Sequence, residues 1–146
     1  MKISSSFARL GYSGILAAAV IALAAFSTAV FADTVKVVLS GDLKVPPVKT
    51  TASGSGTLTI NPDMSVGGSV ATTGLDGTMA HIHQGAPGIS GPVIIALVKA
   101  GEHDWAVPPG AKLTPAQYQA YKAGGLYVNV HTAANKGGEI RGQLLP

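Results

Sequence analysis

From residue 34 onward, hydrophobic and polar residues alternate in short runs that are separated by Gly, Pro, Asn and Asp. Alternation with a period of two, between such turn signals, is typical of β-strands. The pattern predicts seven strands, at residues 34–40, 54–60, 65–73, 79–84, 92–98, 126–132 and 138–145. Seven short strands in one domain predict an all-β fold, either a sandwich or a Greek-key barrel.

A segment near residue 115 has a helical rather than a strand pattern. Thr114 offers a capping hydroxyl, Pro115 suits the first helical position, and Gln117 stands three residues after the cap. Glycines at 124–125 then end the pattern. We therefore expect one short helix over residues 115–123 that covers one end of the barrel, with its two tyrosines as packing groups.

The beginning of the chain has the pattern of a secretory signal peptide. Lys2 and Arg9 precede an apolar run over 15–26, and small residues follow it. The run is about a dozen residues long, shorter than the roughly 20 that span a bilayer. The sequence thus predicts a signal peptide at 1–32, a folded domain at 33–146, and a periplasmic or secreted mature chain without a membrane span.

Most of the net charge belongs to this leader. The whole chain has a formal net charge of +3, whereas residues 33–146 hold 8 basic and 7 acidic side chains, a net +1. A near-neutral surface lacks the clustered Lys and Arg that supply most of the affinity for nucleic acid, so no nucleic-acid partner is expected. Cysteine is absent, which excludes both a disulfide scaffold and a lipid anchor.

Three of the four histidines fall within predicted strands. His81 and His83 are two residues apart, so they project from the same face at a separation of about 7 Å. In the later strand, Val128 and Val130 must face the core, which directs His131 outward. If the two strands are neighbours, three imidazoles converge on the outside of the barrel, and neutral imidazole suits copper or zinc.

Other interpretations of these side chains remain open. The three histidines could instead be solvated, or hydrogen-bonded to the backbone of the Gly-rich loop at 85–91. His103 lies with Trp105 in a stretch, 101–112, that reads as a long surface loop, so it is either a fourth ligand or none. Met79 shares the face of the first two histidines, and its thioether would favour Cu(I), although ordinary packing is the simpler interpretation.

Glu139 and Arg141 share one face of the last predicted strand, with Ile140 directed inward. An exposed pair of this kind contributes under about 1 kcal/mol, so the expected role is a solvated or loop-tethering pair. Arg141 could alternatively attract an anion beside a copper site. The chain lacks a Cys nucleophile, a Gly-x-Ser-x-Gly elbow, a P-loop and a His-Glu-x-x-His motif, and we expect no catalytic residue.

Four ordered blocks resemble the CHRD domain, a family named for repeats in the animal protein chordin and widespread in secreted bacterial proteins. They lie at residues 45–48, 81–93, 127–135 and 137–144, and the resemblance covers about residues 34–145. It implies a secreted, immunoglobulin-like β-sandwich. In chordin the domain belongs to a protein that acts by binding another protein, which implies a binding role here as well.

The histidine strand, the Gly-rich loop and the closing strand are also similar to parts of the copper,zinc superoxide dismutase barrel. This similarity favours copper, because His81 and His83 match the paired copper histidines of that enzyme and His131 matches its later strand histidine. The histidine that bridges the two metals, the zinc loop and the cysteine pair have no clear counterpart in this chain.

Two functions from different classes follow. The first is an exported, non-catalytic binding domain that holds copper, or less favourably zinc, through His81, His83 and His131. The second is a module without a metal that contacts a protein or surface through its edge and loops, those at 45–48 and around Trp105 included. A superoxide dismutase-like redox enzyme is a minor third alternative.

Overall fold

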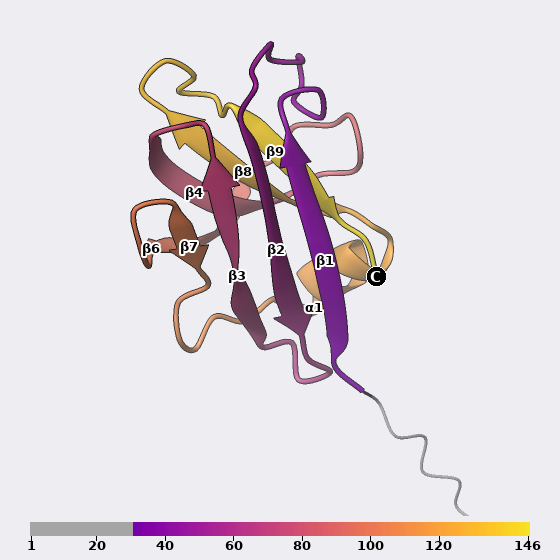
Figure 1. Ribbon diagram of the computed structural model, residues 1–146. Helices are drawn as coiled ribbons and strands as arrows, with labels where there is room; N and C mark the ends of the chain where they lie inside the picture. The colour runs from indigo at the N-terminus through magenta and orange to yellow at the C-terminus, as the bar shows by residue number, and fades with distance from the viewer. Residues whose placement is uncertain (1–30) are drawn as a thin grey trace, which may run out of the picture.

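The computed structural model describes residues 31–146, so all but the last two residues of the expected signal peptide lie outside the described residues. This part of the chain contains nine strands and one helix (Figure 1). The elements are β1 (Asp33–Ser40), β2 (Ser53–Ile60), β3 (Val66–Thr73), β4 (Gly77–Gln84), β5 (Val93–Ala96), β6 (Val98–Lys99), β7 (Asp104–Ala106), α1 (Pro115–Lys122), β8 (Leu126–Thr132) and β9 (Ile140–Leu144). The predicted all-β fold with one short helix is confirmed.

The strands form one antiparallel sheet in the order β5-β4-β8-β9-β1-β2-β3-β7-β6, and Figure 1 shows β1, β2 and β3 side by side. The two strands at the ends of this order, β5 and β6, are separated in the chain by Leu97 alone. Leu97 N donates to Ala80 O, while β5 pairs with β4 and β6 pairs with β7. The sheet therefore curls into a nearly closed barrel, and the single strand predicted over 92–98 is divided into two short ones.

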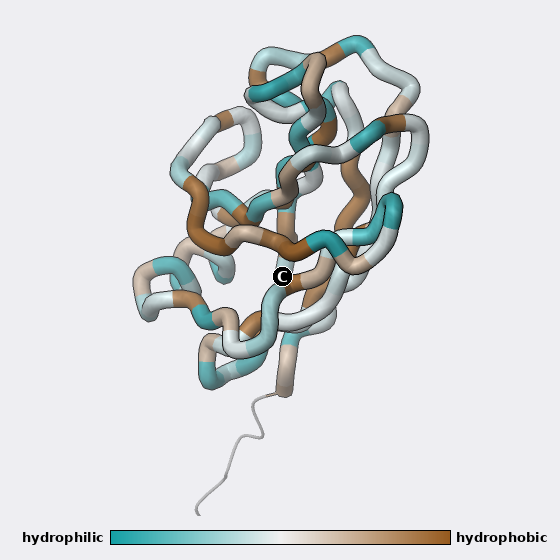
Figure 2. Tube along the Cα trace, turned by 90° about the vertical axis from the view of Figure 1, so that its left-hand side faces the viewer, coloured by the Kyte–Doolittle hydropathy of each residue, from teal (hydrophilic) through white to brown (hydrophobic). Residues whose placement is uncertain are grey.

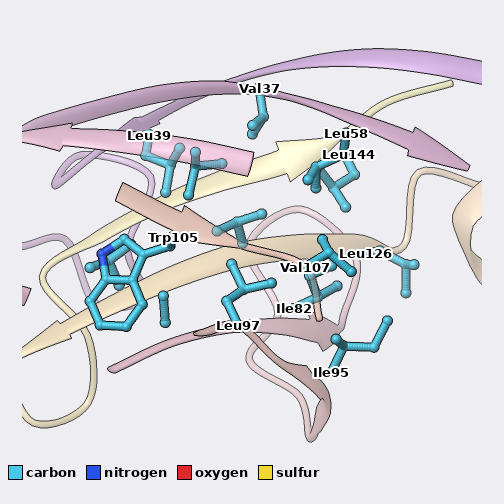
Figure 3. Packing of buried hydrophobic residues seen from close by; sticks show 14 of the residues in the cluster. Val37, Leu39, Leu58, Ile82, Ile95, Leu97, Trp105, Val107, Leu126 and Leu144 are labelled. Atoms are coloured by element: carbon cyan, nitrogen blue, oxygen red, sulfur yellow. The ribbon is translucent and has the colours of Figure 1, made fainter. Parts of the chain in front are cut away.

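The core lies inside the barrel, on one face of the alternating strands. In β1, Val35, Val37 and Leu39 are buried while the residues between them are exposed. Figure 2 shows the same alternation of hydrophobic and hydrophilic residues along the chain. In Figure 3, Leu39 lies above the interior and Leu97 below it. Each fully buried aliphatic side chain contributes roughly 1.5–3 kcal/mol, so the inner face is the main source of stability.

The predicted surface loop over 101–112 is wrong at its centre. Residues Asp104–Ala106 form β7, which pairs with β3, and Trp105 is only 3% exposed. The indole packs against the backbone of Gly77, where even a methyl group would meet it at 2.9 Å. A three-residue strand is too short for alternation to reveal it, and tertiary packing of the indole determines its conformation.

The helix forms as predicted and ends at Lys122 rather than at 123. Thr114 and Gln117 make a capping box: Gln117 N donates to Thr114 Oγ1 at 3.2 Å, and Thr114 N donates to Gln117 Oε1 at 2.8 Å. Tyr121 is fully buried in the core and Tyr118 packs against it, so both tyrosines are packing groups. Within residues 31–146 there is no helix long and apolar enough to cross a membrane.

Candidate metal centre

The pairing of β4 with β8 brings the predicted histidines together on the outer face of the barrel. Met79 stands opposite His131, His81 opposite Asn129, and His83 opposite Tyr127. The intervening residues of both strands, such as Ile82 and Val128, face the core. Side chains opposite one another or diagonal across a strand pair lie within reach of each other, so the register alone places three imidazoles in one cluster.

The geometry of the cluster suits a small metal ion. One ligand nitrogen from each of His81, His83 and His131 lies within 4.8 Å of the others. His81 Nδ1 and His131 Nε2 are 3.0 Å apart. Nitrogens bound to one ion at 2.0–2.1 Å are separated by about 3.3–3.6 Å, which lies between the 3.0 Å of this pair and the 4.8 Å limit of the cluster.

Backbone carbonyls orient two of the rings. His83 Nδ1–H donates to Gly91 O at 2.9 Å, and His131 Nδ1–H donates to Lys136 O at 2.7 Å. Each neutral ring therefore carries its lone pair on Nε2, toward the cluster. The His83 Nε2 atom is buried and has no hydrogen-bond partner in the described part of the chain. A carbonyl that fixes the tautomer from the far side of the ring is the usual support of a metal-ligating histidine.

The surroundings keep the imidazoles neutral. Burial, and then the neighbouring histidines, lower the pKa of His81 below its ordinary 6.5. Burial is also the largest cause that lowers the pKa of His83, and His131, Lys44 and Arg141 lower it further, while the hydrogen bond to Gly91 opposes them. Both rings are therefore uncharged at neutral pH, which is the form that binds metals.

Three loops cover the outer face: the loop after β1 (41–52), the loop after β4 (85–92) and the loop after β8 (133–139). The cluster is therefore more enclosed than surface histidines would be. His83 and His131 are each 8% exposed, and every residue of β8 is buried. The loop after β4 is held by Arg141, whose guanidinium donates to Ala86 O and Ile89 O at 3.0 Å each. The same guanidinium lies 3.5 Å from the centre of the Tyr127 ring. Arg141 was predicted to be exposed and either solvated or tethering a loop. It is 2% exposed, so the predicted exposure is wrong, and it does tether a loop.

The loop after β1 inserts a lysine next to the cluster. Lys44 Nζ donates to Asn129 Oδ1 and to Gly137 O, both at 2.9 Å. Asn129 Nδ2 in turn lies 3.2 Å from His131 Nε2 and donates to Gly137 O. Gly138 packs directly on this carboxamide with φ +107°, a conformation that favours glycine and leaves no room for a Cβ. The loop after β1 and the loop after β8 thus meet at the Asn129 carboxamide beside the histidines.

The sequence as a whole matches one family. The model of the CHRD domain matches residues 35–144, which hold all nine strands except the first two residues of β1. The chain belongs to the CHRD domain family. No curated protein and no solved structure matches the chain.

The remaining candidate residues of this CHRD domain are placed as follows. His103 is outside the histidine cluster; its carbonyl accepts from Thr72 N at 2.9 Å, beside β7. Met79 is 49% exposed on the outer face, so it is not a core packing group. Glu139 does not pair with Arg141 and instead accepts hydrogen bonds from Thr50, Thr132 and Asn135.

Two neighbours of the cluster were not predicted as part of a site. Alternation with the core-facing Val128 and Val130 puts Asn129 on the outer face, but nothing in the sequence indicates that it bridges a histidine and a lysine. Lys44 gave no signal at all, because its contact with Asn129 joins residues 85 positions apart. The predicted alternative of a hydrogen bond to the 85–91 loop is correct for His83, and it leaves the other nitrogen of the ring free.

Proposed function

We propose that this CHRD domain is an exported, non-catalytic metal-binding domain that holds copper through His81, His83 and His131. The observation that carries the proposal is the buried His83 Nε2, a lone pair without a partner on one of three imidazoles whose ligand nitrogens lie within 4.8 Å of one another. Leaving such an acceptor unpaired costs about 1–3 kcal/mol, and a coordinated ion removes that cost. Export rests on the leader pattern: removing residues 1–32 would leave every strand intact, since β1 begins at Asp33.

Binding rather than turnover is favoured by the position of Arg141. A guanidinium that attracts a substrate anion needs free N–H groups near the ion. Three of the five N–H groups of Arg141 donate to Ala86 O, Ile89 O and Gln143 Oε1, and its plane covers Tyr127. The side chain therefore tethers a loop. Copper is favoured over zinc by the similarity of the histidine pattern to that of copper,zinc superoxide dismutase.

Metal titration with matched variants tests the proposal. The purified protein, the His81→Ala/His83→Ala double variant and a His103→Ala control would be titrated with Cu(I), Cu(II) and Zn²⁺ while the thermal midpoint is followed. We expect a raised midpoint and submicromolar copper affinity for the wild type and the control, and a loss of at least about 100-fold in the double variant. Equal, weak binding by all three proteins would overturn the proposal.

A role in contacting a protein or surface is the second candidate. A hollow of about 200 Å³ opens beside the cluster, lined by Lys44, Val45, Pro46, Val48, Asn135, Gly137 and Gly138. Val45 is 39% exposed, whereas the indole of Trp105, in the other loop predicted for this role, is buried. A Val45→Asp variant that loses a partner while the double histidine variant retains it would favour this function over metal binding.

A further inference from the structure

Two buried cations lie next to the histidine cluster without a counter-ion. Lys44 is 8% exposed and Arg141 is 2% exposed. Neither forms a salt bridge: the ion pairs within residues 31–146 join other residues, and the hydrogen-bond acceptors of both cations are carbonyl and carboxamide oxygens. Buried charges in proteins are usually paired, so this part of the molecule has an uncompensated positive field.

The distances of the two cations from the cluster follow from the contacts that link them to it. Lys44 Nζ is 2.9 Å from Asn129 Oδ1, and Asn129 Nδ2 is 3.2 Å from His131 Nε2. With the width of one carboxamide between them, the ammonium lies no more than about 8 Å from the His131 nitrogen. On the other side, the Arg141 guanidinium stacks at 3.5 Å on Tyr127, whose ring stacks at 4.9 Å on that of His83.

The cluster itself provides no negative charge to offset these cations. Its three potential ligands are imidazoles. The carboxylate of Glu139, in the neighbouring loop, hydrogen-bonds to Thr50, Thr132 and Asn135 and makes no hydrogen bond or salt bridge with Lys44, Arg141 or a histidine. Every cation that enters the cluster is therefore repelled in proportion to its charge. A divalent ion suffers twice the repulsion of a monovalent one at the same position.

We infer that the centre selects a monovalent over a divalent ion, and therefore takes copper as Cu(I), with Lys44 as the residue that sets this selectivity. The inference rests on the proposed metal-binding function and adds the charge state of the ion. The half-exposed Met79 opposite His131 agrees with it, because a thioether is a ligand type that suits Cu(I). Arg141 adds to the field but also holds the loop, so Lys44 is the cleaner position for a test.

The test compares Cu(I) with Zn²⁺, which share a closed d-shell and differ in charge. Dissociation constants of the full chain would be measured by anaerobic competition with chromophoric chelators, for the wild type and for Lys44→Gln. The amide keeps a donor for Asn129 Oδ1 and removes the charge. One unit charge at about 8 Å predicts that the Kd for Zn²⁺ falls about 10- to 30-fold relative to the Kd for Cu(I).

Two controls separate charge from structure. Lys44→Arg keeps the charge and should leave the Zn²⁺ to Cu(I) ratio within about threefold of the wild type. Lys49→Gln makes the same chemical change at an exposed position of the same loop and should leave the ratio unchanged. An unchanged ratio in a folded Lys44→Gln protein would overturn the selectivity.

Two further outcomes are also decisive. If Lys44→Gln does not fold, the two dissociation constants of the wild type alone test the inference. A Kd for Zn²⁺ as low as the Kd for Cu(I) would overturn it. If neither ion binds more tightly to the wild type than to His81→Ala/His83→Ala, the proposed function itself fails. The two failures are therefore distinguishable by whether any ion binds.

Discussion

Arg141 is the side chain whose removal should reveal how the outer face is held together. In Arg141→Met the aliphatic stem remains, but Ala86 O, Ile89 O and Gln143 Oε1 lose their donor. Each buried acceptor left without a partner costs about 1–3 kcal/mol, with the lower value appropriate here because a loosened loop admits water. Loss of the stack on Tyr127 adds about 1 kcal/mol.

These costs are partly offset because the buried guanidinium lacks a counter-ion and burial itself lowers its pKa. We therefore expect a net loss of about 2–3 kcal/mol in the free energy of unfolding. For a domain of this size that corresponds to a fall of about 10 °C in Tm. Arg141→Lys keeps the charge but not the planar fork or the stack, and it should be destabilised by nearly as much.

Urea denaturation of the wild type and both variants measures the free energy, and hydrogen exchange locates the effect. Exchange should accelerate at the amides of Ile89 and Gly91, which hydrogen-bond to Ala86 O and Tyr127 Oη, and not at the core strands. A Met variant as stable as the wild type would refute the reasoning. It would mean that the cost of desolvating the guanidinium outweighs the stabilisation from its hydrogen bonds. In other proteins, replacing buried charged groups by apolar residues is often neutral or stabilising for the same reason.

Two further predictions concern the histidine cluster. The pKa values of His81 and His83 lie below the ordinary 6.5, so below that pH the unfolded chain binds more protons than the folded one. The stability of the metal-free protein is therefore full above about pH 6.5 and falls as the pH drops below that value. Thermal midpoints measured across this pH range should show the fall. The His81→Gln/His83→Gln variant should have a flatter pH dependence. Met79→Leu should weaken Cu(I) binding severalfold in chelator competition and leave Zn²⁺ binding unchanged. Equal effects on the binding of both ions would show that the Met79 thioether is not a ligand.

The sequence was informative wherever one periodicity dominated. Alternation in β4 and β8 placed His81, His83 and His131 on the outer face, and the structure confirms that they meet. The helix was predicted from Thr114, Pro115 and Gln117, because capping is a local interaction. The helix depends on neighbours within four residues, whereas the meeting of the histidines also depends on the pairing of β4 with β8, which the sequence left open.

The covering of the outer face could not be predicted in this way. Arg141 reaches Ala86 and Ile89 across more than 50 positions, and Lys44 reaches Asn129 across 85. Alternation distinguishes two faces of a strand but not whether a loop lies over the outer one. For this reason Arg141 was expected to be exposed and Lys44 was overlooked. The three-residue β7 was predicted as a loop for another reason, because it is too short to show alternation.

The arrangement also separates the determinants of folding from those of the site. The apolar core occupies the inner face of the barrel, whereas the histidines project from the outer face. The orientation of His83 and His131 comes from Gly91 O and Lys136 O, which belong to two different loops. A barrel with the same three histidines but other loops would therefore fold and still direct the imidazole lone pairs elsewhere. β4 and β8 supply the three imidazoles of the cluster, and the loops that Arg141 and Lys44 hold in place orient two of the rings.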